Sequence, residues 1–259
     1  MKISVLTENN PGPLTAAEHG LSYLIEADGK RILFDAGQSD LFRKNADIIG
    51  VNLKEIDMII LSHGHFDHGN GLEFLSGGTL LCHPGCFIKR YRKSDRSYIG
   101  LKYSGEEIAV KFNMITSREP FKITSSITFA GEIPRITPFE SKITSFELED
   151  ATPDFVTDDS ALIFILPQGL FIITGCGHAG IVNIMKHASA ITGIDEIYGI
   201  MGGFHLREED NQATETIKYL KTSNVTHILP SHCTSGAALE MFRATFGGRT
   251  VQTGSIFSF

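Results

Sequence analysis

The fold of this chain is decided by one stretch, Leu61-Ser62-His63-Gly64-His65-Phe66-Asp67-His68-Gly69-Asn70-Gly71. It places three histidines and one aspartate within six positions, directly after the apolar run Asp57-Met58-Ile59-Ile60-Leu61. An apolar run that ends at a glycine-rich segment is typical of a buried strand followed by a turn. We therefore expect the polar side chains to lie on a loop at the end of a strand, where rigid scaffolds usually hold functional groups.

The residue types in this loop indicate a metal site. Neutral imidazoles and a carboxylate are donors that suit zinc, iron or manganese. His63 and His65 lie two positions apart, so their rings can point to the same side of an extended segment. Asp67 and His68 are adjacent and are expected to point toward a second position, which indicates two metals rather than one. A solvated, histidine-rich loop is the alternative.

At these residues the chain resembles the metallo-β-lactamase superfamily, whose hallmark is the same His-x-His-x-Asp-His loop. The resemblance implies an α/β fold, a four-layer αββα sandwich with two β-sheets face to face, helices outside and metals at one edge. It also implies zinc as the cofactor, with two ions in each chain and with iron or manganese as alternatives.

Composition and charge limit the classes of protein that fit. The 259 residues are 42% hydrophobic and 20% charged, which is ordinary for a globular chain and fits a single metallo-β-lactamase-type domain over residues 1–259, with a variable or cap region about 83–146. A net charge of −7 argues against general binding to nucleic acid or to an anionic membrane. The sequence shows no secretory segment, no apolar run long enough to span a bilayer and no dense cysteine pattern, so we expect a cytoplasmic protein with reduced thiols.

A predicted hairpin leads to the aspartate nearest the metal loop. Two β-rich runs, 21–27 and 31–35, flank Asp28-Gly29-Lys30, which favours a tight turn between two strands. The hairpin ends in Asp35-Ala36-Gly37, which resembles a turn of the superfamily in which the aspartate braces the metal loop from behind. The resemblance thus implies that Asp35 orients the metal-binding histidines. A turn or helix-capping aspartate is the alternative.

The second half of the chain predicts a similar strand end. A hairpin is expected over 160–166 and 170–174, and it leads to Gly175-Cys176-Gly177-His178-Ala179-Gly180 and then to a helix with apolar residues at helical spacing. The superfamily normally has a bridging aspartate near this strand end, whereas this chain has Cys176 and, two residues later, His178. We expect His178 to bind metal. Cys176 is either a thiolate ligand, which zinc accepts, or a small buried residue.

Two later histidines follow predicted strands. His205 comes after an apolar segment and the turn Gly202-Gly203, and we expect it to bind substrate or to lie beside a metal. His232 follows a strand-like run and precedes a helix near Ser235, where the superfamily places its final metal histidine. The resemblance then divides the ligands: the first metal takes His63, His65 and His178, and the second takes Asp67, His68 and His232.

Three residues are candidates for catalysis and substrate binding. Asp67 is the candidate catalytic residue, because its carboxylate can orient the nucleophile or accept its proton. Arg90 lies in the strongest basic cluster, residues 89–93, and can bind an anionic group such as phosphate, with a solvated surface as the alternative. His19, in the segment 18–22, is a further candidate. We therefore expect a small-molecule substrate, with an anionic one as an option.

Five segments resemble one subgroup of the superfamily, metal-dependent hydrolases grouped with an archaeal dihydropterin-ribofuranosylaminobenzene-phosphate synthase. These segments are 18–22, 62–68, 175–180, 202–206 and 231–233. The function that the resemblance implies is hydrolysis of an ester, lactone or phosphoester by a metal-activated hydroxide. The alternatives are a synthase that joins a pterin to an arylamine ribofuranosyl phosphate, and a non-catalytic metal or ligand sensor. The sequence indicates no particular oligomeric state.

Overall fold

The structure of the chain is a computed structural model that describes residues 1–207 and 210–259. Contacts between residues divide the chain into two compact units. Unit 1 comprises Met1–Arg118, Ser145–Asp154 and Val251–Phe259, and unit 2 comprises Glu119–Thr144 and Phe155–Thr250. The predicted cap region is thus divided between the two units, and a single domain over 1–259 stays a prediction.

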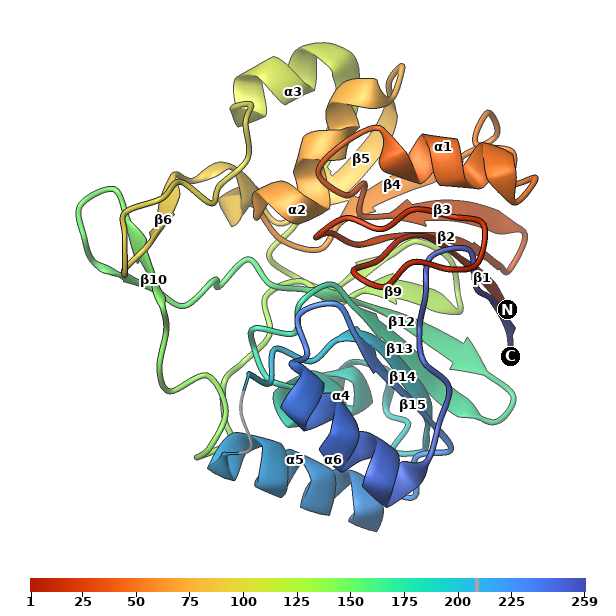
Figure 1. Cartoon of the computed structure of the whole chain (residues 1–259), viewed down its shortest axis with the longest axis vertical. Helices are drawn as coiled ribbons and strands as arrows, with labels where there is room; N and C mark the ends of the chain where they lie inside the picture. Colours follow the sequence, from red (N-terminus) through yellow and green to blue (C-terminus); the bar gives the residue numbers. More distant parts are fainter. Residues whose placement is uncertain (208–209) are drawn as a thin grey trace. The chain divides into compact units, whose positions relative to one another are not determined.

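Unit 1 is built on a seven-stranded sheet with the order β16-β1-β2-β3-β4-β5-β7 (Figure 1). Its strands are β1 (Lys2–Thr7), β2 (Ser22–Ala27), β3 (Lys30–Phe34), β4 (Met58–Leu61), β5 (Gly78–Cys82), β7 (Phe112–Thr116) and β16 (Ile256–Ser258). The hairpin predicted around Asp28 and Gly29 is confirmed, and both residues have the positive φ that a tight hairpin turn requires. From β3 to β7 neighbouring strands run parallel, so the carboxyl ends of β3, β4 and β5 share one edge of the sheet.

Helical segments of unit 1 pack on this sheet, where they contact strand residues that alternate along the chain. They are α1 (Leu41–Ile48), α2 (Phe66–Gly69), η1 (Asn70–Phe74), η2 (Pro84–Phe87) and α3 (Gly105–Lys111). Phe42 of α1 lies in one buried cluster with Leu33 of β3 and Ile59 and Leu61 of β4. The spacing of two between the β4 residues is the side-chain period of a strand, which places both on the same face.

A second, smaller sheet belongs to unit 1. It joins β6 (Arg90–Arg92), β10 (Phe146–Leu148) and β11 (Pro153–Asp154) in the order β11-β10-β6, with antiparallel pairing throughout. The basic cluster that includes Arg90 therefore lies on a strand rather than on a free loop.

Unit 2 is built on a six-stranded sheet with the order β15-β14-β13-β12-β9-β8. Its strands are β8 (Phe121–Lys122), β9 (Ile127–Phe129), β12 (Ala161–Leu166), β13 (Gly169–Thr174), β14 (Ile197–Gly203) and β15 (His227–Ser231). β12 and β13 form the second predicted hairpin. β13, β14 and β15 run parallel, so the loops that follow these three strands all begin at the same edge.

Three helices pack on one face of the unit 2 sheet (Figure 1). They are α4 (Ile181–Thr192), α5 (Asn211–Thr222) and α6 (Gly236–Phe246). Ile184 of α4, Ile217 of α5 and Phe242 of α6 share a buried cluster with the strand residues Ile172 and Ile200. Polar caps define the helix starts: Ser235, for example, accepts the backbone N–H of Ala238 at 3.1 Å, which satisfies one of the first N–H groups of α6.

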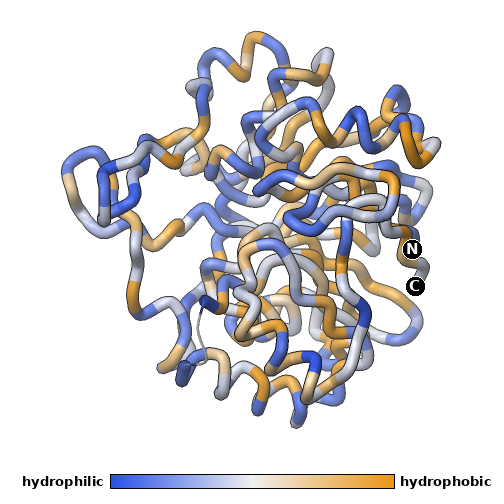
Figure 2. The backbone as a smooth tube through the Cα atoms, viewed as in Figure 1, coloured by the Kyte–Doolittle hydropathy of each residue, from blue (hydrophilic) through white to orange (hydrophobic). Residues whose placement is uncertain are grey.

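Hydrophobic residues are concentrated along the strands, whereas hydrophilic residues are frequent in the connecting loops (Figure 2). This distribution is the one expected when alternating strand residues fill a core and loop backbones stay near water. Within the described ranges, each helix is too short or too polar to cross a lipid bilayer.

Candidate metal centre

The loop after β4 forms a compact cluster of donor side chains within unit 1. The Nε2 atom of His63 lies 3.0 Å from Nδ1 of His65, and the ring centroids of His63 and His68 are 4.3 Å apart. His63 and His68 are fully buried, and His65 and Asp67 are only 6% and 4% exposed. Buried imidazoles and a carboxylate that converge in this way could hold a metal ion.

Part of the predicted loop is helical. Asp67 and His68 lie in the single turn α2, which begins after His65, and the N–H of Gly69 donates to the carbonyl of His65 at 3.2 Å. His65 itself has extended backbone, with φ −88° and ψ 148°. The backbone thus changes from extended to helical within this short segment, and the ring of His68 still lies beside that of His63. The division of these residues between two metals stays a prediction.

Asp35 lies directly behind this cluster. Its Oδ1 accepts the backbone N–H of Ser62 at 2.7 Å, and its Oδ2 accepts the Ser62 hydroxyl at 2.7 Å. The same Oδ2 lies 2.7 Å from Nδ1 of His68. Carboxylates in this position orient metal-binding imidazoles in known sites, so the geometry supports the predicted role of Asp35.

Hydrogen bonds around Asp35 assign the tautomers of two histidines. Because the hydroxyl of Ser62 donates to Asp35, its oxygen accepts the proton on Nδ1 of His63, which lies 2.9 Å away. Nδ1 of His68 likewise carries the proton that faces Asp35. A neutral imidazole with its proton on Nδ1 has its lone pair on Nε2, which is the atom that a metal would take in either ring.

Burial keeps His63 in the neutral form that ligation requires. Its pKa lies well below the ordinary value of 6.5, first because the ring is desolvated and next because His68 and His65 oppose a further positive charge. Arg90 lowers the pKa further, whereas Asp67 raises it. A metal competes with a proton for the same nitrogen, so the lowered pKa favours metal binding at neutral pH.

His19 approaches the cluster from the protein surface. Its Nε2 lies 3.1 Å from Oδ2 of Asp67, and its side chain is 56% exposed whereas that of Asp67 is 6% exposed. The carbonyl of His19 accepts the side-chain amide of Gln38 at 2.9 Å. A Cβ on the next residue, Gly20, would lie 2.8 Å from the carbonyl oxygen of Asp67, so a glycine is needed for this approach. The predicted substrate-binding histidine thus touches the candidate catalytic carboxylate.

Arg90, the other predicted substrate-binding residue, is fully buried. Its Nε lies 3.5 Å from Oδ2 of Asp154, and its guanidinium donates to the carbonyl of Gly85 at 3.1 Å. The neighbouring Lys89 is exposed and pairs with Glu149 at 2.9 Å. This placement favours a structural role for Arg90, and substrate binding by Arg90 stays a prediction.

In unit 2, His178 lies at the junction between β13 and α4 that the sequence predicted. Oδ2 of Asp159 accepts the backbone N–H of Ala179 at 2.9 Å, which holds the residue next to His178. Burial raises the pKa of Asp159 to about 6, although the hydrogen bond from Ala179 and the charge of Arg135 act in the opposite direction.

The start of α4 is capped by a distant carboxylate. Gly180, the residue before the helix, offers no side chain, and Glu140 instead accepts the N–H groups of Val182 at 2.8 Å and Asn183 at 2.9 Å. These contacts satisfy two of the N–H groups that every helix leaves without a partner at its first turn. Burial raises the pKa of Glu140 above its ordinary value, even though the two backbone donors lower it.

The remaining unit 2 candidates lie on the loops after β14 and β15 and on the loop before α4. His205 and His232 both have left-handed backbone, with φ of 47° and 51°. Non-glycine residues adopt this conformation mainly where the surrounding structure imposes it, often at functional sites. The ring centroids of His178 and His205 are 4.0 Å apart, and Cys176 is 4% exposed.

Four residues near the candidates were not assigned a role from the sequence: Ser62, Glu140, Asp159 and Cys233. Ser62 precedes His63 and Cys233 follows His232, so their positions beside predicted ligands could have marked them as part of the site. Asp159 and Glu140 act on the His178 junction from 20 and more residues away, and no local pattern marks them.

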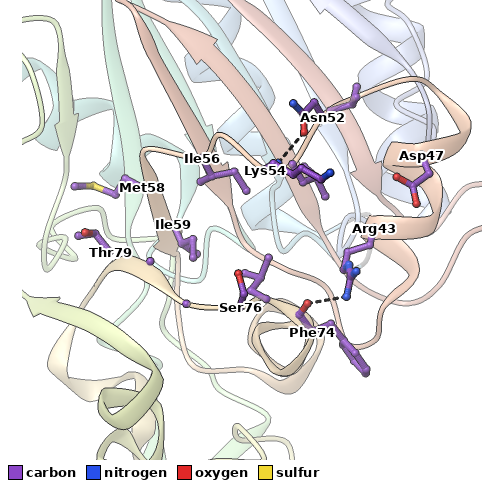
Figure 3. Close-up of a pocket in the computed structure, with 15 residues that line it drawn as sticks. Arg43, Asp47, Asn52, Lys54, Ile56, Met58, Ile59, Phe74, Ser76 and Thr79 are labelled. Atoms are coloured by element: carbon purple, nitrogen blue, oxygen red, sulfur yellow. Dashed lines mark hydrogen bonds between the residues drawn. The ribbon is translucent and has the colours of Figure 1, made fainter.

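A cavity of about 490 Å³ lies elsewhere in unit 1 (Figure 3). It is lined by Met58 and Ile59 at the start of β4 and by Thr79 at the start of β5, whereas the metal loop follows the end of β4. Arg43 closes one side by donating to the carbonyl of Phe74 at 2.9 Å. The cavity is therefore separate from the histidine cluster.

Comparison with known proteins agrees with this fold. The family model for the metallo-beta-lactamase superfamily matches residues 16–79. The 7,8-dihydropterin-6-methyl-4-(beta-D-ribofuranosyl)-aminobenzene-5'-phosphate synthase of Methanocaldococcus jannaschii is 35% identical over 271 residues, covering 95% of this chain and 92% of that protein. An uncharacterised protein of the same organism is 36% identical over 249 residues, covering 92% of each.

Among solved structures, a metal-dependent hydrolase of the beta-lactamase superfamily is 27% identical with a TM-score of 0.89. The match covers 100% of this chain and 99% of that one. This likeness confirms the predicted α/β metallo-β-lactamase fold.

Proposed function

Because this chain belongs to the metallo-β-lactamase superfamily, we propose that it is a metal-dependent hydrolase acting on an ester, lactone or phosphoester. The observation that carries the proposal is the buried cluster of His63, His65, Asp67 and His68 with Asp35 behind it. Fold alone does not imply a reaction, but a donor set of this composition supports metal-assisted hydrolysis. The solved relative described as a metal-dependent hydrolase supports the same class.

The cluster fits a metal chemically. Its histidines are buried, the pKa of His63 favours the neutral ring, and the Asp35 network leaves the lone pair of His63 and His68 on Nε2. We propose zinc, two ions in each chain, with iron or manganese as alternatives. The proposed ligands are those that the sequence predicted, in two sets: His63, His65 and His178, and Asp67, His68 and His232. The assignment of His178 and His232 is supported by the family resemblance.

When bound, the metals would lower the pKa of a water molecule to about 7 and polarise the oxygen of the substrate's carbonyl or phosphoryl group. Oδ2 of Asp67 would hold the attacking water and accept its proton. Nε2 of His19, 3.1 Å from that oxygen, can take the proton onward. Because His19 is largely exposed, it can pass the proton to the leaving group or to solvent.

A synthase that joins a pterin to an arylamine ribofuranosyl phosphate is the second candidate. The 35% identity to the dihydropterin-ribofuranosylaminobenzene-phosphate synthase, over nearly the whole of both chains, favours it. This reaction would use the same donors, with an arylamine carbon or nitrogen as the nucleophile instead of water. The nucleophile would form a bond to the pterin substrate as the bond from that substrate to its diphosphate breaks, and the diphosphate would leave. Product analysis with a dihydropterin diphosphate and an arylamine ribofuranosyl phosphate separates the two: a joined product supports the synthase, and release of a hydrolysis product alone supports the hydrolase.

The test of metal-dependent catalysis is His65→Ala, with His187→Ala on helix α4 as the matched control. Metal content by elemental analysis and turnover of phosphodiesters, lactones and esters are measured on both purified variants. Removal of the imidazole should lower bound metal and turnover together in His65→Ala, whereas His187→Ala should keep both. Circular dichroism on each variant confirms that the chain is folded.

Two results would contradict the proposal. Full turnover in a metal-free His65→Ala protein would exclude metal-dependent catalysis. Stoichiometric metal in the wild type without turnover of any substrate, pterin substrates included, would favour the non-catalytic sensor. A cytoplasmic location with a small-molecule substrate is part of the same proposal.

A further inference from the structure

Three neighbouring strand ends of unit 2 bring two thiols and one imidazole together. β13, β14 and β15 are parallel neighbours, with Thr174 beside Gly202 and Gly203 beside Ser231. Each strand is followed at its second residue by a side chain that binds metals: Cys176 after β13, His205 after β14 and Cys233 after β15. The sheet register therefore places all three at the same edge of the sheet.

The three donor atoms are close enough to share an ion. The two sulfur atoms and an imidazole nitrogen of His205 all lie within 4.8 Å of one another. Tetrahedral coordination with metal–sulfur bonds of ~2.3 Å and a metal–nitrogen bond of ~2.0 Å spaces neighbouring donors by about 3.5–3.8 Å. The upper limit of 4.8 Å exceeds these spacings by about 1.0–1.3 Å, a difference that small side-chain rotations close. The thiol of Cys233 at present donates to the carbonyl of Cys176 at 3.2 Å, a contact that a thiolate–metal bond would replace.

A glycine between the cysteines makes their approach possible. A Cβ on Gly203 would lie 2.6 Å from the sulfur of Cys233 and 3.0 Å from Cα of Cys176. Any larger residue at this position would therefore push the two loops apart. The N–H of Gly203 also donates to the carbonyl of Gly175 at 2.9 Å, which ties the loop after β14 to the loop before Cys176.

Further hydrogen bonds hold the other loops in register. The N–H of Phe204 donates to the hydroxyl of Thr234 at 3.1 Å, and the N–H of Ser235 donates to the carbonyl of Leu206 at 2.8 Å. These bonds join the two residues on either side of His205 to the two residues that follow Cys233. His205 itself is held at φ 47°. A donor set whose backbone is fixed before the ion arrives loses little conformational entropy on binding.

We propose that Cys176, Cys233 and His205 form a thiolate-rich site for a borderline or soft divalent cation such as zinc. Two cysteines and one histidine are a ligand set that zinc uses in catalytic sites, with a fourth position left for water or substrate. All four cysteines of the chain lie in the described ranges, and none of them forms a disulfide. The site goes beyond the proposed hydrolase centre, because the ligands proposed for that centre, on both units, are imidazoles and a carboxylate and include no thiolate.

Cobalt(II) is the probe that tests the proposal, because a thiolate bound to it produces a charge-transfer absorption band in the near ultraviolet. The full-length wild type is loaded with Co²⁺ under reducing conditions, and the band and bound cobalt are measured. We expect the band in the wild type. Cys233→Ser should remove most of the band and about one cobalt ion per chain, because the site is left with one thiolate and one imidazole.

Two controls separate this site from other cysteines and from the hydrolase centre. Cys82→Ala removes a buried thiol on β5 and should keep the band at wild-type intensity. His65→Ala removes a donor of the other proposed centre and should also keep it. Circular dichroism shows whether each variant is folded, and the wild-type spectrum tests the site without any substitution.

Three results would overturn the proposal. One is cobalt bound to the wild type without a thiolate band. Another is loss of the band in folded His65→Ala, which would mean that the thiolates belong to the same ion as the His63–His68 loop. The third is a Cys176–Cys233 disulfide in peptide maps of protein purified in the presence of zinc without reductant, which would identify a redox pair. If His65→Ala keeps full activity, only the hydrolase proposal is contradicted. The cobalt band still tests the thiolate site in that case.

Discussion

The Nδ1 atom of His68 lies 2.7 Å from Oδ2 of Asp35, and both side chains are withdrawn from solvent. The same oxygen accepts the hydroxyl of Ser62, whose own oxygen accepts a proton from His63. One carboxylate thus sets the orientation and tautomer of two proposed ligands, directly for His68 and through Ser62 for His63.

Asp35→Asn should weaken metal binding about 10–100-fold, as loss of a carboxylate that orients metal ligands does in known sites. An amide has one acceptor oxygen, whereas Asp35 accepts three hydrogen bonds, so at least one donor loses its partner. Isothermal titration of the metal-free protein with zinc measures the change. Asp195→Asn, at an exposed position, is the matched control and should bind zinc as the wild type does. Equal affinity in the two variants would contradict an orienting role for Asp35.

Gly64→Ala should distort the metal loop and destabilise the fold. A Cβ at this position would lie 1.8 Å from the carbonyl oxygen of Cys86, and a backbone atom cannot rotate away. Overpacking of this kind typically costs about 1–3 kcal/mol, and the bound metal should decrease with it. Urea unfolding and elemental analysis measure both. Gly236→Ala meets no atom within 4 Å and serves as the control, with stability equal to or above that of the wild type.

Arg90→Met should lower the free energy of unfolding by about 3–5 kcal/mol, because it leaves the buried carboxylate of Asp154 without its cation. Lys89→Met removes an exposed charge that pairs with Glu149, and solvent screening should leave stability nearly unchanged. Denaturant unfolding compares the two variants. If Arg90→Met is instead as stable as the wild type and raises only the KM for an anionic substrate, then substrate binding, as the sequence predicted, is its main role.

Glu140 should make a stability contribution that decreases as pH rises. Burial raises its folded-state pKa above the ordinary value of 4.5, so between these two values the folded chain holds a proton that the unfolded chain has released. The contribution is therefore fully present below about pH 4.5 and falls as pH rises through the folded pKa. The measurement is the difference in unfolding free energy between the wild type and Glu140→Gln from pH 4 to pH 8, and we expect the wild-type advantage to shrink with pH. A wild-type advantage that grows with pH would contradict this prediction. It would mean that the N–H groups of Val182 and Asn183 lower the pKa of Glu140 by more than burial raises it.

Much of the fold was predictable because its signals are local. The two hairpins were predicted from short apolar runs on either side of a turn, α4 from apolar residues at helical spacing, and α6 from its start near Ser235. The three-stranded sheet of unit 1 was not predicted. Its strands have only two or three residues, and β6 pairs with β10 more than 50 positions away, so no periodicity within either segment marks them.

The candidate site likewise has residues that the local sequence marks and residues that it does not. The His63–His68 loop was recognisable because its donors are contiguous, and Asp35 because it ends a predicted strand. The burial of Arg90 was not recognisable, since its partner Asp154 lies on another segment. Glu140 reaches the start of α4 across more than 40 positions, and a lone glutamate carries no local mark of that contact.

By itself, the sequence determined the class of fold and named the candidate donors, except Cys233. It could do so because the hydrophobic period, the turn residues and the spacing of His63, His65 and His68 act over a few positions. Only the tertiary structure decided that Cys176 and Cys233, 57 positions apart, meet beside His205. That meeting depends on which strands are neighbours and on their register, and these are set by packing between distant segments. The local sequence pattern indicates which side chains can bind a metal. The order of β13, β14 and β15 determines which of these side chains lie close enough to share one ion.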